Sequence, residues 1–178
     1  MPAFAVPMHR VPLIRPLLFL DFEASGLTPG SWPIEIGYAW ITGATVEVVA
    51  SLIAPRPEWS LAEWSDTAAR VHGIALAALD AAPSADALAA ETDRFAAFDV
   101  VSDNPAWDGL WLDRLRGPDR PRIPVRGLRG EIRRRLSPRA ADEISQRRLN
   151  TPAAHRAGPD AERLALAWAA AQDYGLAA

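Results

Sequence analysis

Three strand-like segments lie close together in the first third of the chain, and helical patterns dominate the rest. Residues 17–22 form a short apolar run. Residues 34–41 and 44–53 are rich in β-branched and aromatic side chains, and the Thr-Gly pair between them predicts a hairpin. A further short strand is expected within residues 99–103. Three consecutive strands followed by helices that alternate with strands predict an α/β domain with a mixed central sheet.

Helix start signals support this division. Asn104 and Pro105 fit the N-cap and first position of a helix, and Pro159 fits the opening of the last one. The expected helical segments are residues 61–71, 75–79, 85–98, 105–116, 128–136, 138–149 and 159–174. A short strand is also expected at 123–125. Residues 1–16 hold four prolines and are interpreted as an irregular lead-in to a single domain at 17–178.

Composition excludes several classes of protein. The 178 residues include no cysteine, so disulfides, thiolate zinc sites and a cysteine nucleophile are excluded. The hydrophobic share of 49% argues against intrinsic disorder. No apolar run is long enough for a membrane helix, and the proline-broken start does not resemble a signal peptide. A cytoplasmic protein is therefore expected.

Charge is distributed unevenly along the chain. The formal net charge is −3, which gives no general attraction to nucleic acid. Residues 114–148, called here the arginine-rich stretch, nevertheless hold twelve arginines and four acidic residues. Such a stretch suits a protein that binds an anion locally, and it equally suits a solvated helical face.

Two carboxylates end the first predicted strand. Asp21 and Glu23 are two residues apart, so both project to one face while Phe22 points to the core. Paired carboxylates at a strand end can bind hard divalent cations. Taken alone, this spacing also fits a solvated strand end.

Two later stretches carry further candidates. Asp108 falls in the first turn of the helix that begins after Asn104, where a carboxylate is also favoured by the helix dipole. Asp103, at the preceding strand end, competes with it. His155 lies in a loop and Asp160 in the first turn of the last helix. A loop histidine can act as a general base, or can simply lie at the surface.

Together, in this order, these residues resemble the DnaQ-like 3′–5′ exonucleases, also called the DEDDh family. The matching stretches are residues 21–27, 34–37, 71–74, 104–108 and 155–161. The resemblance extends over residues 17–174. It implies an RNase H-like fold, in which a three-stranded antiparallel start is joined by parallel strands and flanked by helices.

The resemblance also implies a mechanism. Asp21, Glu23, Asp108 and Asp160 would hold two Mg²⁺ or Mn²⁺ ions, and His155 would take the proton from the attacking water. The expected reaction is hydrolysis of the terminal phosphodiester at the 3′ end of single-stranded DNA or RNA, releasing nucleoside 5′-monophosphates. A homodimer is expected on the same ground.

Substrate contacts are expected from a second group of residues. Leu27 and Trp32 are candidates to wedge or stack the terminal base, although Trp32 could equally be a packing residue. Backbone atoms of Phe22 and Ala24 could contact the terminal sugar. His72, before Gly73, could contact substrate or belong to a turn.

Two alternatives stay open. One is a catalytically weak nucleic-acid-binding relative that acts through partners. The other is a different α/β metallo-hydrolase that uses two of the carboxylates on small phosphomonoesters.

Overall fold

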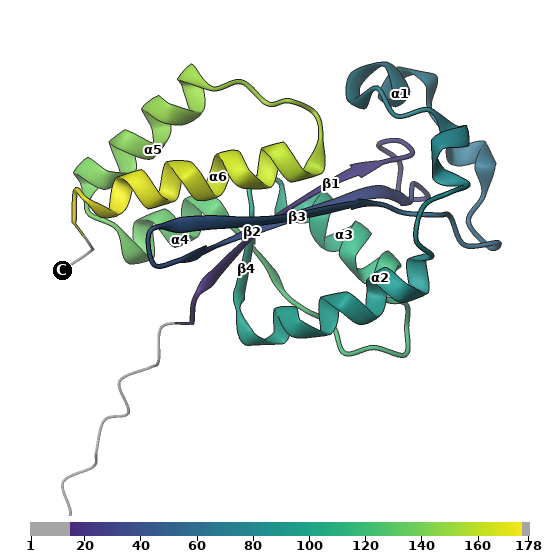
Figure 1. The fold of residues 1–178 in the computed structure, drawn as a ribbon, viewed down its shortest axis with the longest axis horizontal. Coiled ribbons are helices and arrows are strands. Elements are labelled where there is room, and N and C mark those ends of the chain that lie inside the picture. Colours follow the sequence, from purple (N-terminus) through teal and green to yellow (C-terminus); the bar gives the residue numbers. More distant parts are fainter. Residues whose placement is uncertain (1–14, 176–178) are drawn as a thin grey trace, which may run out of the picture.

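The structure, a computed structural model, describes residues 15–175. Five strands form one sheet in the order β3-β2-β1-β4-β5 (Figure 1). Their bounds are β1 (Leu17–Ala24), β2 (Pro33–Thr42), β3 (Thr45–Leu52), β4 (Asp99–Ser102) and β5 (Val125–Gly127). The expected lead-in at residues 1–16 falls almost wholly outside the described part of the chain.

The sheet is mixed, as the sequence predicts. β1 pairs antiparallel with β2, and β2 pairs antiparallel with β3. β4 lies parallel to β1 on its other side, and β5 lies parallel to β4. Gly43 turns the β2–β3 hairpin with a φ of 60°, a conformation that glycine adopts at little cost. The antiparallel start and the parallel continuation therefore match the expected fold class.

Helices cover both faces of this sheet. The α-helices are α1 (Asp66–His72), α2 (Ala85–Glu91), α3 (Pro105–Arg116), α4 (Leu128–Arg135), α5 (Pro138–Asn150) and α6 (Ala157–Gln172). Short 3₁₀ helices occupy Leu61–Glu63, Leu76–Leu79 and Thr92–Ala97. In Figure 1, α2 and α3 lie on one side of the sheet, and α5 and α6 lie on the other.

Alternation along β1 builds two separate cores. Leu18, Leu20 and Phe22 pack with α2 and α3 on one face. Leu17 and Phe19 pack with α4, α5 and α6 on the other. Because side chains alternate along a strand, this central strand is apolar on both faces until the polar positions near its end.

The helix boundaries differ from the prediction where serine caps or local turns interrupt a pattern. The segment 61–71 divides, because the Ser65 hydroxyl accepts a hydrogen bond from the Ala68 backbone N–H and starts α1 at Asp66. The segment 85–98 is α-helical only to Glu91 and continues as a 3₁₀ helix. None of the helices in residues 15–175 is long and apolar enough to cross a membrane.

Candidate metal centre

The end of β1 supplies two carboxylates. Asp21 and Glu23 alternate with Phe22 and Ala24, whose side chains are buried in the core beside α2 and α3. Oxygens of Asp21, Glu23 and Asp160 lie within 4.8 Å of one another. Asp21 and Glu23 therefore share a face and meet the last helix, as the spacing along the strand predicts.

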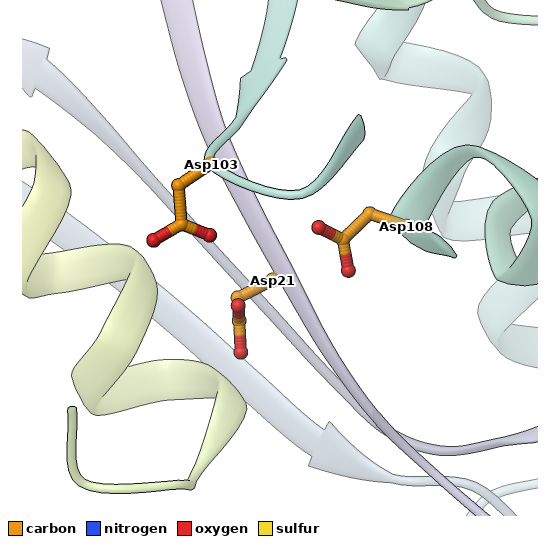
Figure 2. Close-up of side chains that lie close together, drawn as sticks. All are labelled: Asp21, Asp103 and Asp108. Carbon is orange, nitrogen blue, oxygen red and sulfur yellow. The ribbon is translucent and has the colours of Figure 1, made fainter. Parts of the chain in front are cut away.

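The region after β4 supplies two more carboxylates. The Ser102 hydroxyl donates a hydrogen bond to the Asp108 carboxylate and accepts one from the Asn104 N–H at 2.9 Å. Asp108 is thereby fixed in the first turn of α3, with 2% of its surface exposed. Figure 2 shows Asp21, Asp103 and Asp108 directed toward a common space, and their oxygens lie within 4.8 Å of one another.

Helix α6 brings the fourth predicted acid and the loop histidine. The Asp160 carboxylate accepts backbone N–H hydrogen bonds from Ala154 at 3.0 Å and from Arg156 at 3.3 Å. These two residues flank His155, which is exposed and has a φ of 54°. Asp160 therefore fixes the backbone on either side of His155. α6 begins at Ala157, two residues before the predicted start.

Asp21 joins the two groups of acids. It lies with Glu23 and Asp160 on one side, and with Asp103 and Asp108 on the other. The structure thus brings all four predicted carboxylates together from three separate stretches of chain. Asp103, weighed in the sequence as an alternative to Asp108, is present beside it.

A part-buried ion pair supports the start of α6. Glu35 of β2, 3% exposed, accepts hydrogen bonds from Nε of Arg156 at 3.0 Å and Nη2 of Arg156 at 2.6 Å. It also accepts one from the Ala157 N–H at 3.0 Å. Glu35 lies opposite Glu23 in the strand register. The sequence places Glu35 within a matched motif, yet the part played by Arg156 was missed; its position directly after His155 was the available signal.

Burial and mutual repulsion disturb the acids of this centre. Burial, followed by the charges of Asp108, Glu23 and Asp160, raises the pKa of Asp21 to about 10. Burial and then the charge of Glu35 raise the pKa of Glu23 to about 7. Burial also raises the pKa of Asp108 to about 7, against the opposing hydrogen bond from Ser102. A cation bound among these carboxylates would offset both their burial and their mutual repulsion, and would favour their ionised forms.

The donor set fits a hard divalent cation. Both groups offer carboxylate oxygens only, which are the ligands that Mg²⁺, Mn²⁺ and Ca²⁺ prefer. Because Asp21 belongs to both, the centre has two adjacent places where oxygens converge. This arrangement can hold divalent cations, which is a geometry suited to hydrolysis of a phosphate ester.

Of the two residues expected to contact the terminal base, Leu27 is exposed and Trp32 is buried. Leu27 is 71% exposed, on the loop that follows β1. Trp32 is fully buried, and its indole N–H donates to the Ser60 carbonyl at 3.0 Å. Its ring packs 5.9 Å from that of Trp59. Of the two roles that the sequence leaves open for Trp32, the structure therefore favours packing, because the ring is enclosed in a small aromatic core.

His72 belongs to the turn that ends α1 and is not open to a ligand. It is 5% exposed, and its Nδ1 accepts a hydrogen bond from the Ile74 N–H at 3.0 Å. Gly73 ends α1 with a φ of 69°, which lets the chain reverse there. The imidazole is enclosed beside Trp64, and burial lowers its pKa.

Comparison with solved structures identifies the fold. The nuclease domain of 3′hExo, a DEDDh family member bound to rAMP, matches with a TM-score of 0.61 and 14% identity over 92% of this chain and 94% of that one. Cell-death related nuclease 4 (CRN-4) matches with a TM-score of 0.63 and 16% identity over 92% of this chain. Exonuclease I of E. coli, in complex with a dA16 oligonucleotide, matches with a TM-score of 0.62 and 16% identity over 90% of this chain.

This chain spans 65% of the length of CRN-4 and 42% of that of exonuclease I. No family model matches the sequence, and no curated protein matches it. At these identities the likeness is one of fold. The chain shares the RNase H-like fold of these nucleases, as its motifs predict.

Proposed function

We propose that this chain is a metal-dependent 3′–5′ exonuclease that removes nucleoside 5′-monophosphates from the 3′ end of single-stranded DNA or RNA. One observation carries the proposal. The carboxylates of Asp21, Glu23, Asp108 and Asp160 converge from separate elements into two groups that share Asp21. They do so on the fold of proteins described as 3′-exonucleases.

The four acids would hold two Mg²⁺ or Mn²⁺ ions, with Asp21 shared between them. When bound, such ions neutralise phosphate charge and make a bound water more acidic. The surrounding protein encloses two of these carboxylates. Asp108 and Asp160 are almost completely buried, so their positions are set before substrate arrives.

His155 is the proposed general base. It is exposed, and the hydrogen bonds from Ala154 and Arg156 to Asp160, one of the acids of the centre, fix the backbone on both sides of it. An imidazole held in this way can take a proton from an attacking water at neutral pH. Asp160 would then have two roles. It would bind a cation, and it would hold the backbone around His155 in place.

The loop after β1 is the proposed seat for the terminal nucleotide. Its ends are joined by hydrogen bonds, from the Ser25 N–H to the Trp32 carbonyl at 2.8 Å and from the Trp32 N–H to the Ser25 hydroxyl at 3.0 Å. This closed loop presents Leu27 to solvent a few residues after Glu23. We propose that Leu27 packs against the terminal base, and that backbone atoms of Phe22 and Ala24 contact its sugar.

The test is degradation of end-labelled DNA and RNA oligomers, side by side, with and without Mn²⁺, with products resolved at single-nucleotide steps. The expected result is stepwise shortening from the 3′ end that requires metal and is lost in Asp21→Ala and Glu23→Ala. Binding without shortening would favour the catalytically weak relative. Hydrolysis confined to small phosphomonoesters would favour the other metallo-hydrolase.

A further inference from the structure

The arginines of the arginine-rich stretch have different surroundings. Arg126, Arg134 and Arg135 form ion pairs with Asp99 and Glu131, both of which are buried. Asp99 is the first residue of β4, whereas the metal centre follows the last residue of that strand. These three arginines therefore neutralise buried acids at the end of β4 away from the centre.

One arginine of the stretch reaches the centre itself. Arg148, near the end of α5, places Nη2 at 2.7 Å from Oδ2 of Asp103. Arg163 of α6 lies 3.6 Å from the same oxygen through Nη2, and its Nε lies 3.3 Å from Oδ1 of Asp160. Two guanidinium groups thus border the five carboxylates. Arg148 is the more exposed of the two, with 29% of its side chain accessible against 13% for Arg163.

The guanidinium of Arg148 is only partly used. Its Nε is buried and has no hydrogen-bond partner among residues 15–175. An arginine carries about five N–H donors in a planar fork, and that fork matches two oxygens of a phosphate. Because Nε is enclosed by the protein, the atoms of this fork that can meet a phosphate are the terminal ones, Nη1 and Nη2.

We propose that Arg148 binds a backbone phosphate of the single-stranded substrate, and that Asp103 is a positioning residue that holds the guanidinium at the edge of the metal centre. This inference rests on the proposed function and names one of its specificity contacts. Asp103 is placed to do this because its carboxylate faces Asp21 and Asp108 (Figure 2). The same carboxylate also forms the ion pair with Arg148. Because this contact is made to a phosphate and not to a base, it would not depend on the nucleotide sequence of the substrate.

A purely structural role for the same pair makes a different prediction. Arg148 and Asp103 are each more than a quarter exposed, and an ion pair of that kind contributes little to stability. A structural tie between α5 and the end of β4 would alter the melting temperature. It would leave the salt dependence of oligonucleotide binding unchanged.

The experiment measures binding of fluorescein-labelled oligo(dT) and oligo(U) by anisotropy, in Ca²⁺, over a series of KCl concentrations. The variant is Arg148→Gln. The matched control is Arg147→Gln, because Arg147 pairs instead with Glu143 on its own helix at 2.5 Å. For Arg148→Gln, Kd is expected to rise roughly tenfold, the range for a charge-assisted hydrogen bond. The slope of log Kd against log salt is expected to fall by about 0.7, the value for one phosphate contact on a single strand.

Wild-type Kd and slope in Arg148→Gln, or an equal loss in Arg147→Gln, would overturn the inference. If Arg148→Gln does not fold, Arg148→Lys decides: a weaker Kd with the wild-type salt slope supports the fork contact, and an unchanged Kd overturns it. Failure of the proposed function is seen separately. A wild-type protein that binds the oligomers in this way but never shortens them in Mn²⁺ would end the exonuclease proposal and leave the Arg148 contact standing.

Discussion

Gly37 of β2 lies directly against the backbone of Ala157, the first residue of α6. A β carbon at Gly37 would overlap the backbone of Ala157 and of Gly158. Gly37 is also the register partner of Asp21. The absence of a side chain at this one position therefore lets the start of the last helix, with Asp160, approach the strand that carries Asp21.

Replacing Gly37 by Ala is expected to push α6 away from the sheet. Overpacking of this kind costs about 1–3 kcal/mol of unfolding free energy, and it should reduce Mn²⁺ binding by separating Asp160 from Asp21. Urea unfolding and Mn²⁺ titration measure the two effects. The control is Gly130→Ala in α4, where a β carbon meets nothing within 4 Å and helix propensity predicts a gain of about 0.5–1 kcal/mol. Equal behaviour of the two variants would contradict this account of Gly37.

The acids of the centre predict an unusual pH dependence for the metal-free protein. The pKa values of Asp21, Glu23 and Asp108 are raised to about 10, 7 and 7, from ordinary values of 3.8, 4.5 and 3.8. Between those limits the folded state binds more protons than the unfolded state, so the free energy of unfolding falls as pH rises. Each additional proton bound by the folded state lowers the free energy of unfolding by at most about 1.4 kcal/mol per pH unit.

The measurement is urea unfolding at about pH 5 and about pH 8, in EDTA and in Mn²⁺. In EDTA the protein should be less stable at the higher pH. In Mn²⁺ the difference should shrink or reverse, because a cation favours the ionised acids. Asp21→Asn should flatten the profile in EDTA. A metal-free protein that gains stability over this pH range would be inconsistent with a repelling carboxylate centre.

Glu35→Gln tests the support beneath the histidine loop. The change keeps the size of the side chain but removes the charge that pairs with Arg156. Because Arg156 is 45% exposed on its side chain and can be rehydrated, the expected loss is about 1–2 kcal/mol, less than the roughly 3–5 kcal/mol for breaking a fully buried pair. Activity should fall by about tenfold, as for other groups that orient ligands. Glu47→Gln, at an exposed position on β3, is the control and should behave as wild type.

Leu27→Ala tests the proposed seat of the terminal base. Leu27 is 71% exposed, so stability should stay within about 0.5 kcal/mol of wild type. KM for oligonucleotides should rise by about tenfold, the value of burying a leucine against an apolar surface. Leu166→Ala, at a half-exposed position on α6, controls for loss of a surface leucine. Wild-type KM in Leu27→Ala would remove this residue from the substrate site.

Sequence patterns predicted what depends on local periodicity. The alternation at Asp21 and Glu23, and the Asn104-Pro105 start of α3, each describe a few adjacent residues whose geometry follows from one element. The mixed sheet could therefore be expected from the residues, whereas the convergence of the four acids was implied by the family resemblance. The family resemblance supplied the order in which those elements combine.

Other features depend on contacts that no local pattern encodes. Trp32 looks available in the sequence because it lies in a loop of small residues, yet Trp59 and Trp64, far along the chain, enclose it. Arg148 is one of twelve similar arginines in its stretch, and only packing of α5 against α6 separates its surroundings from those of Arg134 and Arg135. Burial and partner choice at such positions are settled by tertiary structure.

The most direct test of the central claim is the fate of a 5′-labelled single-stranded oligomer in Mn²⁺. Wild-type protein should produce a ladder of products shortened one nucleotide at a time from the 3′ end, and Asp21→Asn, matched in size and folded, should reduce the rate by at least about 10²-fold. A labelled strand that stays intact with wild-type protein, or a ladder that persists at the same rate in Asp21→Asn, would contradict the account.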